Sequence, residues 1–251
     1  MPEDPIPTML GTRVTLVGEE KMKKTLLATT VASVALIGGI SQPAVGHEAG
    51  DWIFRAGLVN VDPDASSSLI STADTGPLPG TGADVDDNTQ LGLNLVYMYS
   101  DNIGIEVLAA TPFEHDLEAE GLGAYNFDVT DLGSAKHLPP TVTANYFFGT
   151  ADSTIRPYLG VGVNYTTFFS EDLSGSARSG LGASGLDLDD SWGIAWRGGI
   201  DWEINDSWLV NASFWILDIE TDASFNSALG KVKANVDVDP MVYMISLGYR
   251  F

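Results

Sequence analysis

Residues 241–251, Met-Val-Tyr-Met-Ile-Ser-Leu-Gly-Tyr-Arg-Phe, end the chain and decide its fold. Apolar and more polar side chains alternate along this stretch, and a period of two is typical of a β-strand with two different faces. The chain stops on an aromatic residue that continues the apolar face. This ending favours a strand that meets lipid and closes a barrel, because an open sheet edge cannot exist in hydrocarbon. The alternative is a strand of a soluble β-sandwich that happens to end in Phe. The apolar face consists of Tyr243, Ile245, Leu247, Tyr249 and Phe251.

Composition narrows the classes of function. The 251 residues include 12 basic and 34 acidic side chains, a net charge of −22, and no cysteine. A chain this acidic argues against nucleic-acid binding, which requires basic surfaces. The absence of cysteine excludes disulfides and thiolate metal sites. The length by itself permits one or two domains.

Residues 22–46 have the pattern of a secretory signal peptide. Two lysines stand near its start, residues 26–40 are apolar but too short for a comfortable membrane span, and Ala44-Val45-Gly46 offers a cleavage site of small residues. We therefore expect cleavage after Gly46. A buried core helix with an unusual leader is the alternative.

The signal pattern divides the chain into three parts. Residues 1–21 do not fit in front of a signal peptide, so we expect translation to start at Met22 and the upstream extension to be no part of the protein. The mature protein is then residues 47–251, with His47 at its N-terminus.

The mature part contains eight segments in which apolar and polar residues alternate, an even number, as bacterial barrels require. Their connections are alternately short and long, which is the pattern of periplasmic turns and exterior loops in Gram-negative outer membranes. The sequence therefore predicts an all-β fold, an eight-stranded antiparallel transmembrane β-barrel in the outer membrane. Aromatic residues beside the short turns are expected to form a girdle at the membrane interface. The segments are 51–61, 88–100, 103–113, 138–149, 154–168, 190–204, 207–218 and 238–251.

The long connections hold most of the acidic residues. The first of them, residues 62–87, contains six Asp and no basic residue. A divalent-cation site is one interpretation, but the spacing matches no calcium-binding loop. We favour a solvated exterior surface and predict no metal site.

Charged residues occur at strand positions whose side chains face the barrel interior. The lumen of an eight-stranded barrel is just wide enough for side chains, and an isolated buried ion costs several kcal/mol. We therefore expect these residues to pair and to form a plug that blocks a straight water channel. A catalytic role for Glu106 or Asp201 is the alternative, although arginine neighbours would keep either carboxylate ionised. The predicted plug comprises Arg55, Glu106, Arg156, Arg197, Asp201 and Arg250.

Farther toward the long connections the inward-facing residues are apolar. They either fill the lumen or line a pocket, open to the exterior, that binds a nonpolar ligand. The set is Val59, Val96, Leu108, Trp215, Leu217, Val242 and Met244.

Prolines lie within or beside the predicted third and fourth strands. Proline donates no backbone hydrogen bond, so Pro112, Pro139 and Pro140 mark a place where the wall could open sideways into the membrane. We expect a nonpolar ligand to leave there, because passage through the plug would desolvate paired ions. The alternative is that these prolines only mark where the strands enter the membrane.

His115 and His137 are expected at the exterior rim, on different strands and hydrogen-bonded to loops. The chain contains neither a His-Glu-x-x-His metal-binding motif nor a Gly-x-Ser-x-Gly nucleophile motif. An enzyme would need His137 close to Asp116 or Asp131 and to a nucleophile. We therefore predict no enzyme and no cofactor. A structural or receptor barrel, whose exterior loops bind partners without transport, is the remaining alternative.

Ten short stretches, taken in order, carry a resemblance to a known family. Among them are His-Glu-Ala-Gly-Asp-Trp at 47–52, His-Leu-Pro-Pro-Thr at 137–141 and the closing Gly-Tyr-Arg-Phe at 248–251. The chain resembles the outer-membrane protein W family (OmpW/AlkL) along essentially the whole mature length. The stretches are 47–52 with 55–57, 88–93, 101–106, 108–113, 137–141, 156–158, 164–169, 190–193, 208–211 and 248–251.

The resemblance implies a narrow hydrophobic channel associated with passive uptake of small hydrophobic molecules. In such proteins a Leu and a Trp narrow the bottom of the channel, and the matching positions are Leu108, in Val-Leu-Ala-Ala-Thr-Pro, and Trp215, in Ser-Phe-Trp-Ile-Leu-Asp. The long connections match the family poorly, so the ligand is not identified. The expected partners are outer-membrane lipids, lipopolysaccharide and small hydrophobic ligands, together with the barrel-assembly machinery, which would recognise the strand ending in Phe251.

Overall fold

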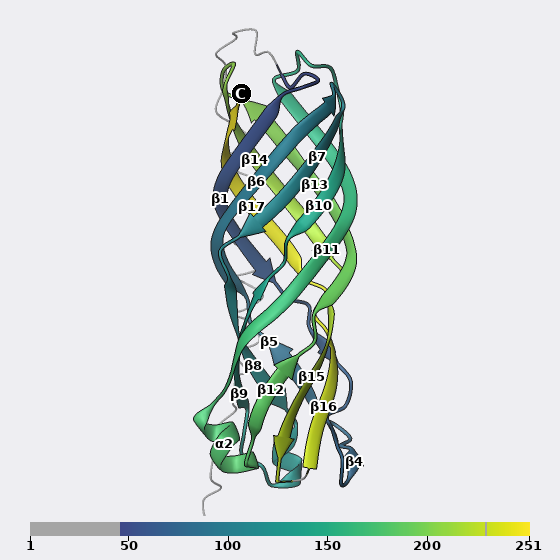
Figure 1. Ribbon diagram of the computed structural model, residues 1–251, viewed down its shortest axis with the longest axis vertical. Coiled ribbons are helices and arrows are strands. Elements are labelled where there is room, and N and C mark those ends of the chain that lie inside the picture. Colours follow the sequence, from purple (N-terminus) through teal and green to yellow (C-terminus); the bar gives the residue numbers. More distant parts are fainter. Residues whose placement is uncertain (1–45, 229) are drawn as a thin grey trace, which may run out of the picture. The chain divides into compact units, whose positions relative to one another are not determined.

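The computed structural model describes residues 46–228 and 230–251. Within them, eight antiparallel strands follow one another in the order β10-β7-β6-β1-β17-β14-β13-β11, and β11 pairs back with β10 to close a barrel (Figure 1). The predicted eight-stranded barrel is confirmed. The predicted upstream extension, and the predicted signal peptide except for its last residue, lie outside the described residues. The barrel strands are β1 (Trp52–Asp62), β6 (Asn88–Ser100), β7 (Ile103–Ala110), β10 (Thr141–Phe147), β11 (Ile155–Leu173), β13 (Ser191–Glu203), β14 (Trp208–Leu217) and β17 (Met241–Arg250).

The first and last strands of the barrel meet edge to edge. β1 and β17 pair in antiparallel register, with Ile53 opposite Arg250. Beyond this ladder, Phe251 and Trp52 exchange two backbone hydrogen bonds of 3.0 and 3.1 Å. Alternate residues are buried and exposed along the whole of β17. The last residue of the chain is therefore part of the closed wall.

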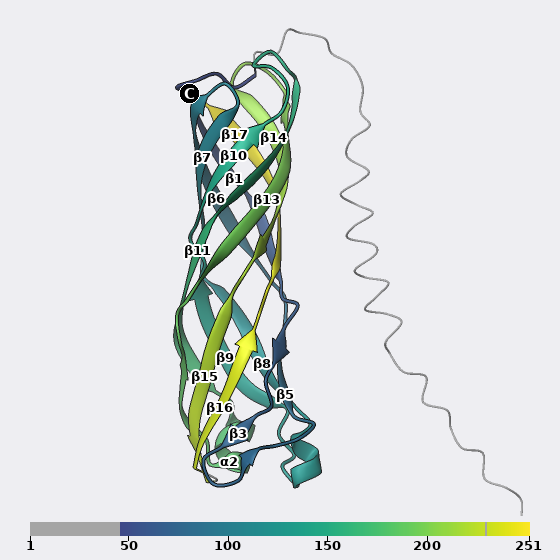
Figure 2. The ribbon, with the colours of Figure 1, turned by 90° about the vertical axis from the view of Figure 1, so that its right-hand side faces the viewer.

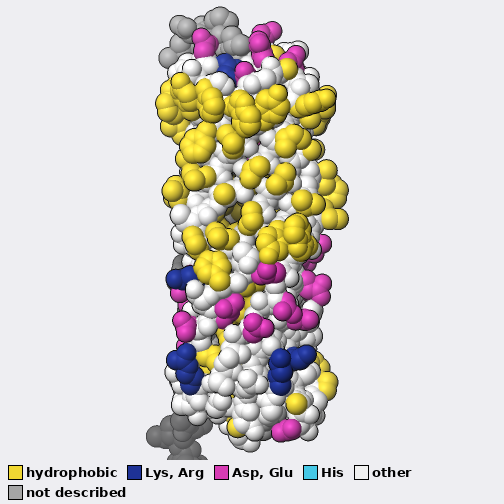
Figure 3. All heavy atoms as spheres, in the orientation of Figure 1, with side chains coloured by type: hydrophobic (Ala, Val, Ile, Leu, Met, Phe, Trp, Pro, Cys, Tyr) yellow, Lys and Arg dark blue, Asp and Glu magenta, His cyan; other side chains and the backbone are white. Residues whose placement is uncertain are grey.

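An apolar band covers the barrel half of the molecule (Figure 3). Outward side chains such as Leu58, Val163 and Ile245 are 67 %, 54 % and 52 % exposed. In water, leaving a side chain of this kind exposed forfeits about 1.5–3 kcal/mol, so the band is suited to lipid. At the end with the short turns, Tyr99 and Phe251 are 73 % and 65 % exposed, as expected for an interfacial aromatic girdle.

Most of the long connections form further strands, which corrects the expectation of loops. In β8, apolar or histidine side chains alternate with acidic ones, and the former are mostly buried. The sequence did not predict this strand, because its many acidic residues favoured a solvated loop. β11 is 19 residues long and continues from the barrel into the extension. The additional strands are β2 (Ser66–Ser67), β3 (Ser71–Thr72), β4 (Gly76–Pro77), β5 (Gly82–Val85), β8 (Phe113–Glu120), β9 (Asp131–Leu138), β12 (Ser184–Leu188), β15 (Glu220–Ser227) and β16 (Gly230–Asp237).

These strands form two sheets that prolong the barrel wall (Figure 2). One consists of β5, β8, β9 and the end of β11, and the other of β12, β15, β16, β3 and β4, with β2 beside β16. Two short helices, η1 (Leu122–Tyr125) and α2 (Gly175–Leu181), lie among them. No helix in the described ranges is long and apolar enough to cross a membrane.

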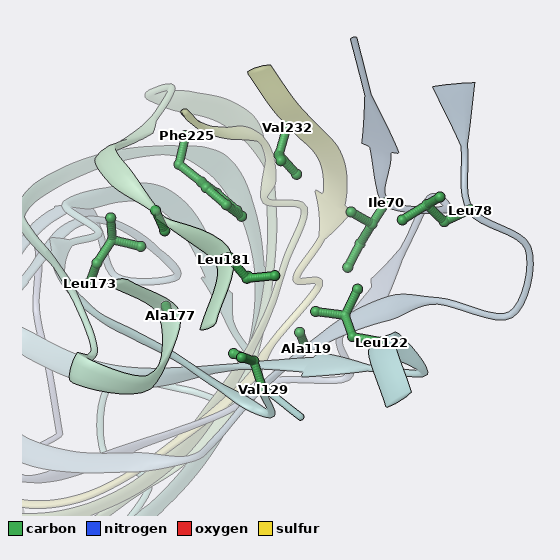
Figure 4. Close-up of a cluster of buried hydrophobic side chains, with 11 residues drawn as sticks. Ile70, Leu78, Ala119, Leu122, Val129, Leu173, Ala177, Leu181, Phe225 and Val232 are labelled. Carbon is green, nitrogen blue, oxygen red and sulfur yellow. The ribbon is translucent and has the colours of Figure 1, made fainter. Parts of the chain in front are cut away.

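A buried apolar cluster fills the tip of the extension (Figure 4). α2 and η1 each contribute a leucine to it, and α2 is held at its start by the Ser174 hydroxyl, which accepts a hydrogen bond from the Ala177 amide. We call this cluster the distal cap. It comprises Ile70, Leu78, Ala119, Leu122, Val129, Leu173, Ala177, Leu181, Ala183, Phe225 and Val232.

Candidate functional site

Four charged side chains from the three strands β1, β7 and β13 meet in the lumen of the barrel. Arg55 Nη1 lies 3.1 Å from Glu106 Oε2, and Arg55 Nη2 lies 2.6 Å from Asp201 Oδ2. Arg197 also pairs with Glu106. All four residues are at most 2 % exposed. We call these four the lumen charge cluster, and its two cations and two anions balance.

Amide side chains complete the hydrogen bonding of the two carboxylates. Asn94 Nδ2 donates to Glu106 Oε1 at 2.6 Å, and Asn145 Nδ2 donates to Glu106 Oε2 at 3.3 Å. Asn211 Nδ2 donates to Asp201 Oδ1 at 2.7 Å. These bonds matter because a buried charge is tolerated only when it is paired and hydrogen-bonded. The sequence predicted the charged residues but not the asparagines, although the two-residue period places these asparagines facing inward and could have indicated them.

The segment before β1 adds a second polar layer. His47 is fully buried, with Nε2 2.8 Å from Asp201 Oδ2 and Nδ1 3.1 Å from Glu203 Oε1. Arg156 donates to the backbone carbonyl oxygens of His47 and Asp101 at 2.9 and 2.6 Å. Together, the lumen charge cluster and the N-terminal segment block the end of the barrel that has the short turns.

Trp215 separates the lumen charge cluster from an apolar region. The Cζ atom of Arg197 lies 4.2 Å from the centroid of the Trp215 ring, and such a contact contributes about 0.5–2 kcal/mol. Trp215 also belongs to a buried apolar cluster with Leu108, and these two side chains are 0 % and 4 % exposed. We call this cluster the pocket floor. It comprises Val59, Val61, Leu108, Phe113, Ala195, Trp215, Leu217, Ile219, Val242 and Met244.

An apolar pocket lies between the two sheets of the extension. It contains about 980 Å³ of space free of protein atoms, its open mouth included. Val61 and Ile219 belong both to its lining and to the pocket floor, whereas Ile70 and Phe225 belong both to its lining and to the distal cap. The pocket is thus bounded by apolar side chains at both ends. This lining suits a small nonpolar ligand.

The strand ladder beside the pocket floor is interrupted on one side. The β7–β10 ladder ends at Leu108, and the β8–β9 ladder starts at Phe113. In the part of the chain that the structure describes, residues 109–112 and 138–140 make no ladder pair with each other. Leu108 and Phe113 both belong to the pocket floor. We call this interruption the ladder gap. Its prolines are Pro112, Pro139 and Pro140.

The opposite edge of the same segment is continuous. Thr141 pairs with Asn164 and Leu138 pairs with Thr167 in the ladders to β11. Between these pairs, the Tyr165 amide donates to the Pro140 carbonyl at 3.1 Å. The gap therefore separates only one pair of neighbouring strands, and the wall around it stays bonded.

Comparison with known proteins places the chain in a family. The family model for the OmpW family matches residues 48–251. The chain belongs to the OmpW family.

Outer membrane protein W of Vibrio cholerae is 44 % identical over 226 residues, which cover 88 % of this chain and 99 % of that relative. The crystal structure of the outer membrane protein OprG from Pseudomonas aeruginosa has 46 % sequence identity and a TM-score of 0.77, covering 83 % of this chain and 99 % of that one. A more distant relative from Pseudomonas aeruginosa, 28 % identical over 226 residues that cover 90 % of this chain and 100 % of the relative, is named dibenzothiophene metabolism operon protein PahQ.

Membership of the OmpW family places this barrel in the outer membrane. Outer-membrane barrels have short turns on the periplasmic side and longer connections outside. The lumen charge cluster is accordingly in the periplasmic half, and the pocket lies in the exterior half.

In this OmpW-family barrel, ion pairs link four of the six residues predicted for the plug, and the other two bind elsewhere. Arg156 and Arg250 make no ion pair with Glu106 or Asp201 among the described residues. Arg250 instead donates to the backbone carbonyls of Gly46 and Asp206. Both arginines lie near the strand ends, where backbone carbonyls of the turns and of the N-terminal segment are within reach. The sequence could not show that this segment enters the lumen.

Val96 was predicted in the apolar path and lies elsewhere. It belongs to a separate buried cluster with Ile53 and Phe147. In the ladders Val96 stands opposite Ile53 and Glu106, so it is level with the lumen charge cluster. The other predicted path residues, Val59, Leu108, Trp215, Leu217, Val242 and Met244, all belong to the pocket floor.

The two histidines of the extension are in contact with each other, which the sequence did not predict. His115 Nε2 lies 2.9 Å from His137 Nε2, and the side chains are 4 % and 6 % exposed. Burial lowers the pKa of His115, and it lowers the pKa of His137 to about 3. The polar partner of His137 is therefore His115, rather than Asp116 or Asp131. Both histidines line the pocket.

Proposed function

We propose that this barrel admits small hydrophobic molecules passively from the exterior and releases them sideways into the membrane. The observation that carries the proposal is the apolar pocket, whose floor adjoins both the lumen charge cluster and the ladder gap. A receptor that binds partners only through its exterior surface has no need of this arrangement.

Passage straight down the lumen is unfavourable for a nonpolar solute. It would have to displace Trp215 and separate the buried ions beneath it. Leaving a buried charge without its partner costs about 3–5 kcal/mol. An apolar solute offers these ions no replacement hydrogen bonds.

Sideways passage through the ladder gap breaks no ladder hydrogen bond, because residues 109–112 and 138–140 form none with each other among the described residues. Opening the wall elsewhere would expose unpaired backbone groups to hydrocarbon, at a cost of several kcal/mol for each group. The gap is therefore the route with the lowest barrier for a solute that prefers lipid.

The name of one relative supports the proposal of a nonpolar cargo. This relative takes its name from an operon for the metabolism of dibenzothiophene, a fused aromatic compound. We extend this chemistry to the present pocket, which has a lining of the same character.

Three further proposals concern partners and catalysis. We infer that the exterior end of the apolar band contacts lipopolysaccharide, and that the barrel-assembly machinery recognises the strand ending in Phe251. We also propose that the protein is not an enzyme, since transport of this kind requires no chemical step.

A disulfide across the ladder gap tests the exit. The chain has no cysteine, so an introduced pair reacts only with itself. Ala109→Cys with Pro140→Cys should bridge the gap, because the neighbouring residues Leu108 and Thr141 are paired. Oxidation should abolish uptake of the fluorescent probe N-phenyl-1-naphthylamine into cells that lack other members of the family, and reduction should restore it.

The matched control is Val142→Cys with Val163→Cys, a pair in the continuous β10–β11 ladder. Its oxidised form should take up the probe at the wild-type rate. The heat-dependent shift on SDS gels would show that each variant is a folded barrel. Undiminished uptake by the oxidised gap variant would rule out this exit.

A further inference from the structure

His115 and His137 form a hydrogen-bonded relay whose direction is fixed at one end. His115 Nδ1 lies 2.6 Å from the backbone carbonyl oxygen of Asp86. A carbonyl only accepts, so His115 Nδ1 must donate. In a neutral imidazole the other nitrogen then accepts. The 2.9 Å contact between the two Nε2 atoms is therefore a donation from His137 to His115.

This direction leaves His137 Nδ1 as an acceptor without a donor. The atom is buried and has no hydrogen-bond partner in the described residues, and the residue is 6 % exposed. A buried acceptor left unpaired costs free energy, so native structures nearly always satisfy such atoms. Since His137 lines the apolar pocket, a bound molecule could supply the missing donor.

We propose that His137 Nδ1 accepts a hydrogen bond from the hydroxyl group of a ligand, so that the pocket prefers small alcohols and phenols to hydrocarbons and ethers of the same size. This inference rests on the proposed function and specifies its substrate class. The ring of Phe168, which also lines the pocket, lies 5.8 Å from that of His137 and provides apolar surface for the rest of the ligand.

A metal ion is a poor alternative occupant. Zinc–nitrogen bonds of about 2.0–2.1 Å hold two ligand nitrogens more than about 3 Å apart, whereas the facing nitrogens are 2.9 Å apart. The part of the chain that the structure describes also offers no cluster of three metal-ligating side chains. The two-histidine relay therefore serves better as a fixed hydrogen-bond acceptor.

Two probes of nearly equal shape test the inference. 1-Naphthol carries a hydroxyl group, and 1-methoxynaphthalene lacks a donor. Their binding would be measured by titration of the full barrel in lipid nanodiscs, with empty nanodiscs subtracted to correct for partition into lipid. We expect 1-naphthol to bind about three- to tenfold more tightly than the ether, the effect of one neutral hydrogen bond.

The double variant His115→Phe with His137→Phe retains both rings and removes both acceptor nitrogens. His137→Phe alone would leave His115 Nε2 as an unpaired acceptor in a residue that lines the pocket. The double variant should bind both probes equally and bind the ether as the wild type does. Lys136→Gln is the matched control, because Lys136 adjoins His137 on β9 but its side chain is 40 % exposed. This variant should keep the preference. In the wild-type protein, the 15N resonance of His137 Nδ1 should move with 1-naphthol and stay in place with the ether, a readout that needs no variant.

The outcomes separate the two claims. Equal binding of both probes by the wild type, a preference that survives in the double variant, or a Nδ1 resonance that does not respond to 1-naphthol would each overturn the hydroxyl-acceptor role and leave the proposed uptake standing. If neither probe bound more than empty nanodiscs bind, the pocket would not be a ligand site and both claims would fail.

Discussion

Arg197 and Trp215 join the two halves of the lumen, with the guanidinium carbon 4.2 Å from the centre of the indole ring. The arginine belongs to the lumen charge cluster and the tryptophan to the pocket floor. The contact between Arg197 and Trp215 therefore lies at the boundary between the ionic and the apolar part of the lumen. A change on either side of this contact affects both the stability of the barrel and the shape of the pocket.

Trp215→Ala should destabilise the barrel by about 3–5 kcal/mol, because it leaves a cavity in a buried cluster and uncovers a buried cation. Trp215→Phe should cost less, since a ring remains over Arg197. Urea unfolding in lipid vesicles, followed on gels by the heat-dependent shift, would measure both. A loss below about 1 kcal/mol for the alanine variant, the mean for an ordinary substitution, would contradict the packing described here.

Glu106→Ala should destabilise the barrel by about 3–5 kcal/mol, because it leaves Arg55 and Arg197 buried without their shared partner. Glu114→Ala is the control. Glu114 pairs with Lys136 at 3.5 Å, and the Glu114 side chain is 53 % exposed, so its loss should cost about 0–1 kcal/mol. If both variants lost less than about 0.5 kcal/mol, water would have to fill the lower lumen.

Acidic pH should lower the free energy of unfolding of the extension. Burial lowers the pKa of His137 from 6.5 to about 3 and also lowers the pKa of His115, although Asp86, Asp87 and Asp116 raise the latter. The unfolded chain therefore binds protons more readily than the folded one. The stabilisation is complete above about pH 6.5 and is lost as the pH falls toward 3, at about 1.4 kcal/mol per pH unit for His137 alone.

Urea unfolding at pH 7.5 and pH 5 would measure this loss. His137→Phe should be less sensitive to the change than the wild type, because the variant has one histidine fewer to protonate on unfolding. Equal sensitivity of the two proteins would mean that the histidine pair is not the source of the pH dependence.

The alternation of residues predicted which side chains face the lumen and which face lipid. Every residue of the predicted plug is indeed buried or nearly so, and the outward apolar residues are exposed. Alternation does not give height along the barrel, which depends on the stagger between strands. That is why Val96 was misplaced: its ladder partner is Ile53, whereas Val59 stands opposite Gln90.

The histidine relay could not be predicted for a similar reason. The two residues lie 22 positions apart, and only the register of β8 against β9 brings their rings together. The register places Phe113 opposite His137 and His115 opposite Ala135, so the two histidines meet diagonally. The contacts at the short-turn end could not be predicted either. Arg156 and Arg250 donate to backbone carbonyl groups there, and every residue of any sequence has such a group.

The prolines of the ladder gap allow a final test of the exit. Pro112→Ala combined with Pro139→Ala restores two backbone donors beside the ladder gap, whereas the Pro140 carbonyl faces β11 and accepts from Tyr165. If these bonds form, they should favour the closed wall by about 0.5–1.5 kcal/mol each and slow probe uptake about three- to tenfold. Pro157→Ala is the control, since Pro157 pairs with Ile200 in a continuous ladder, and its uptake should match the wild type. Wild-type uptake by the double variant, with both new amides protected from hydrogen exchange, would mean that these prolines only mark where strands enter the membrane.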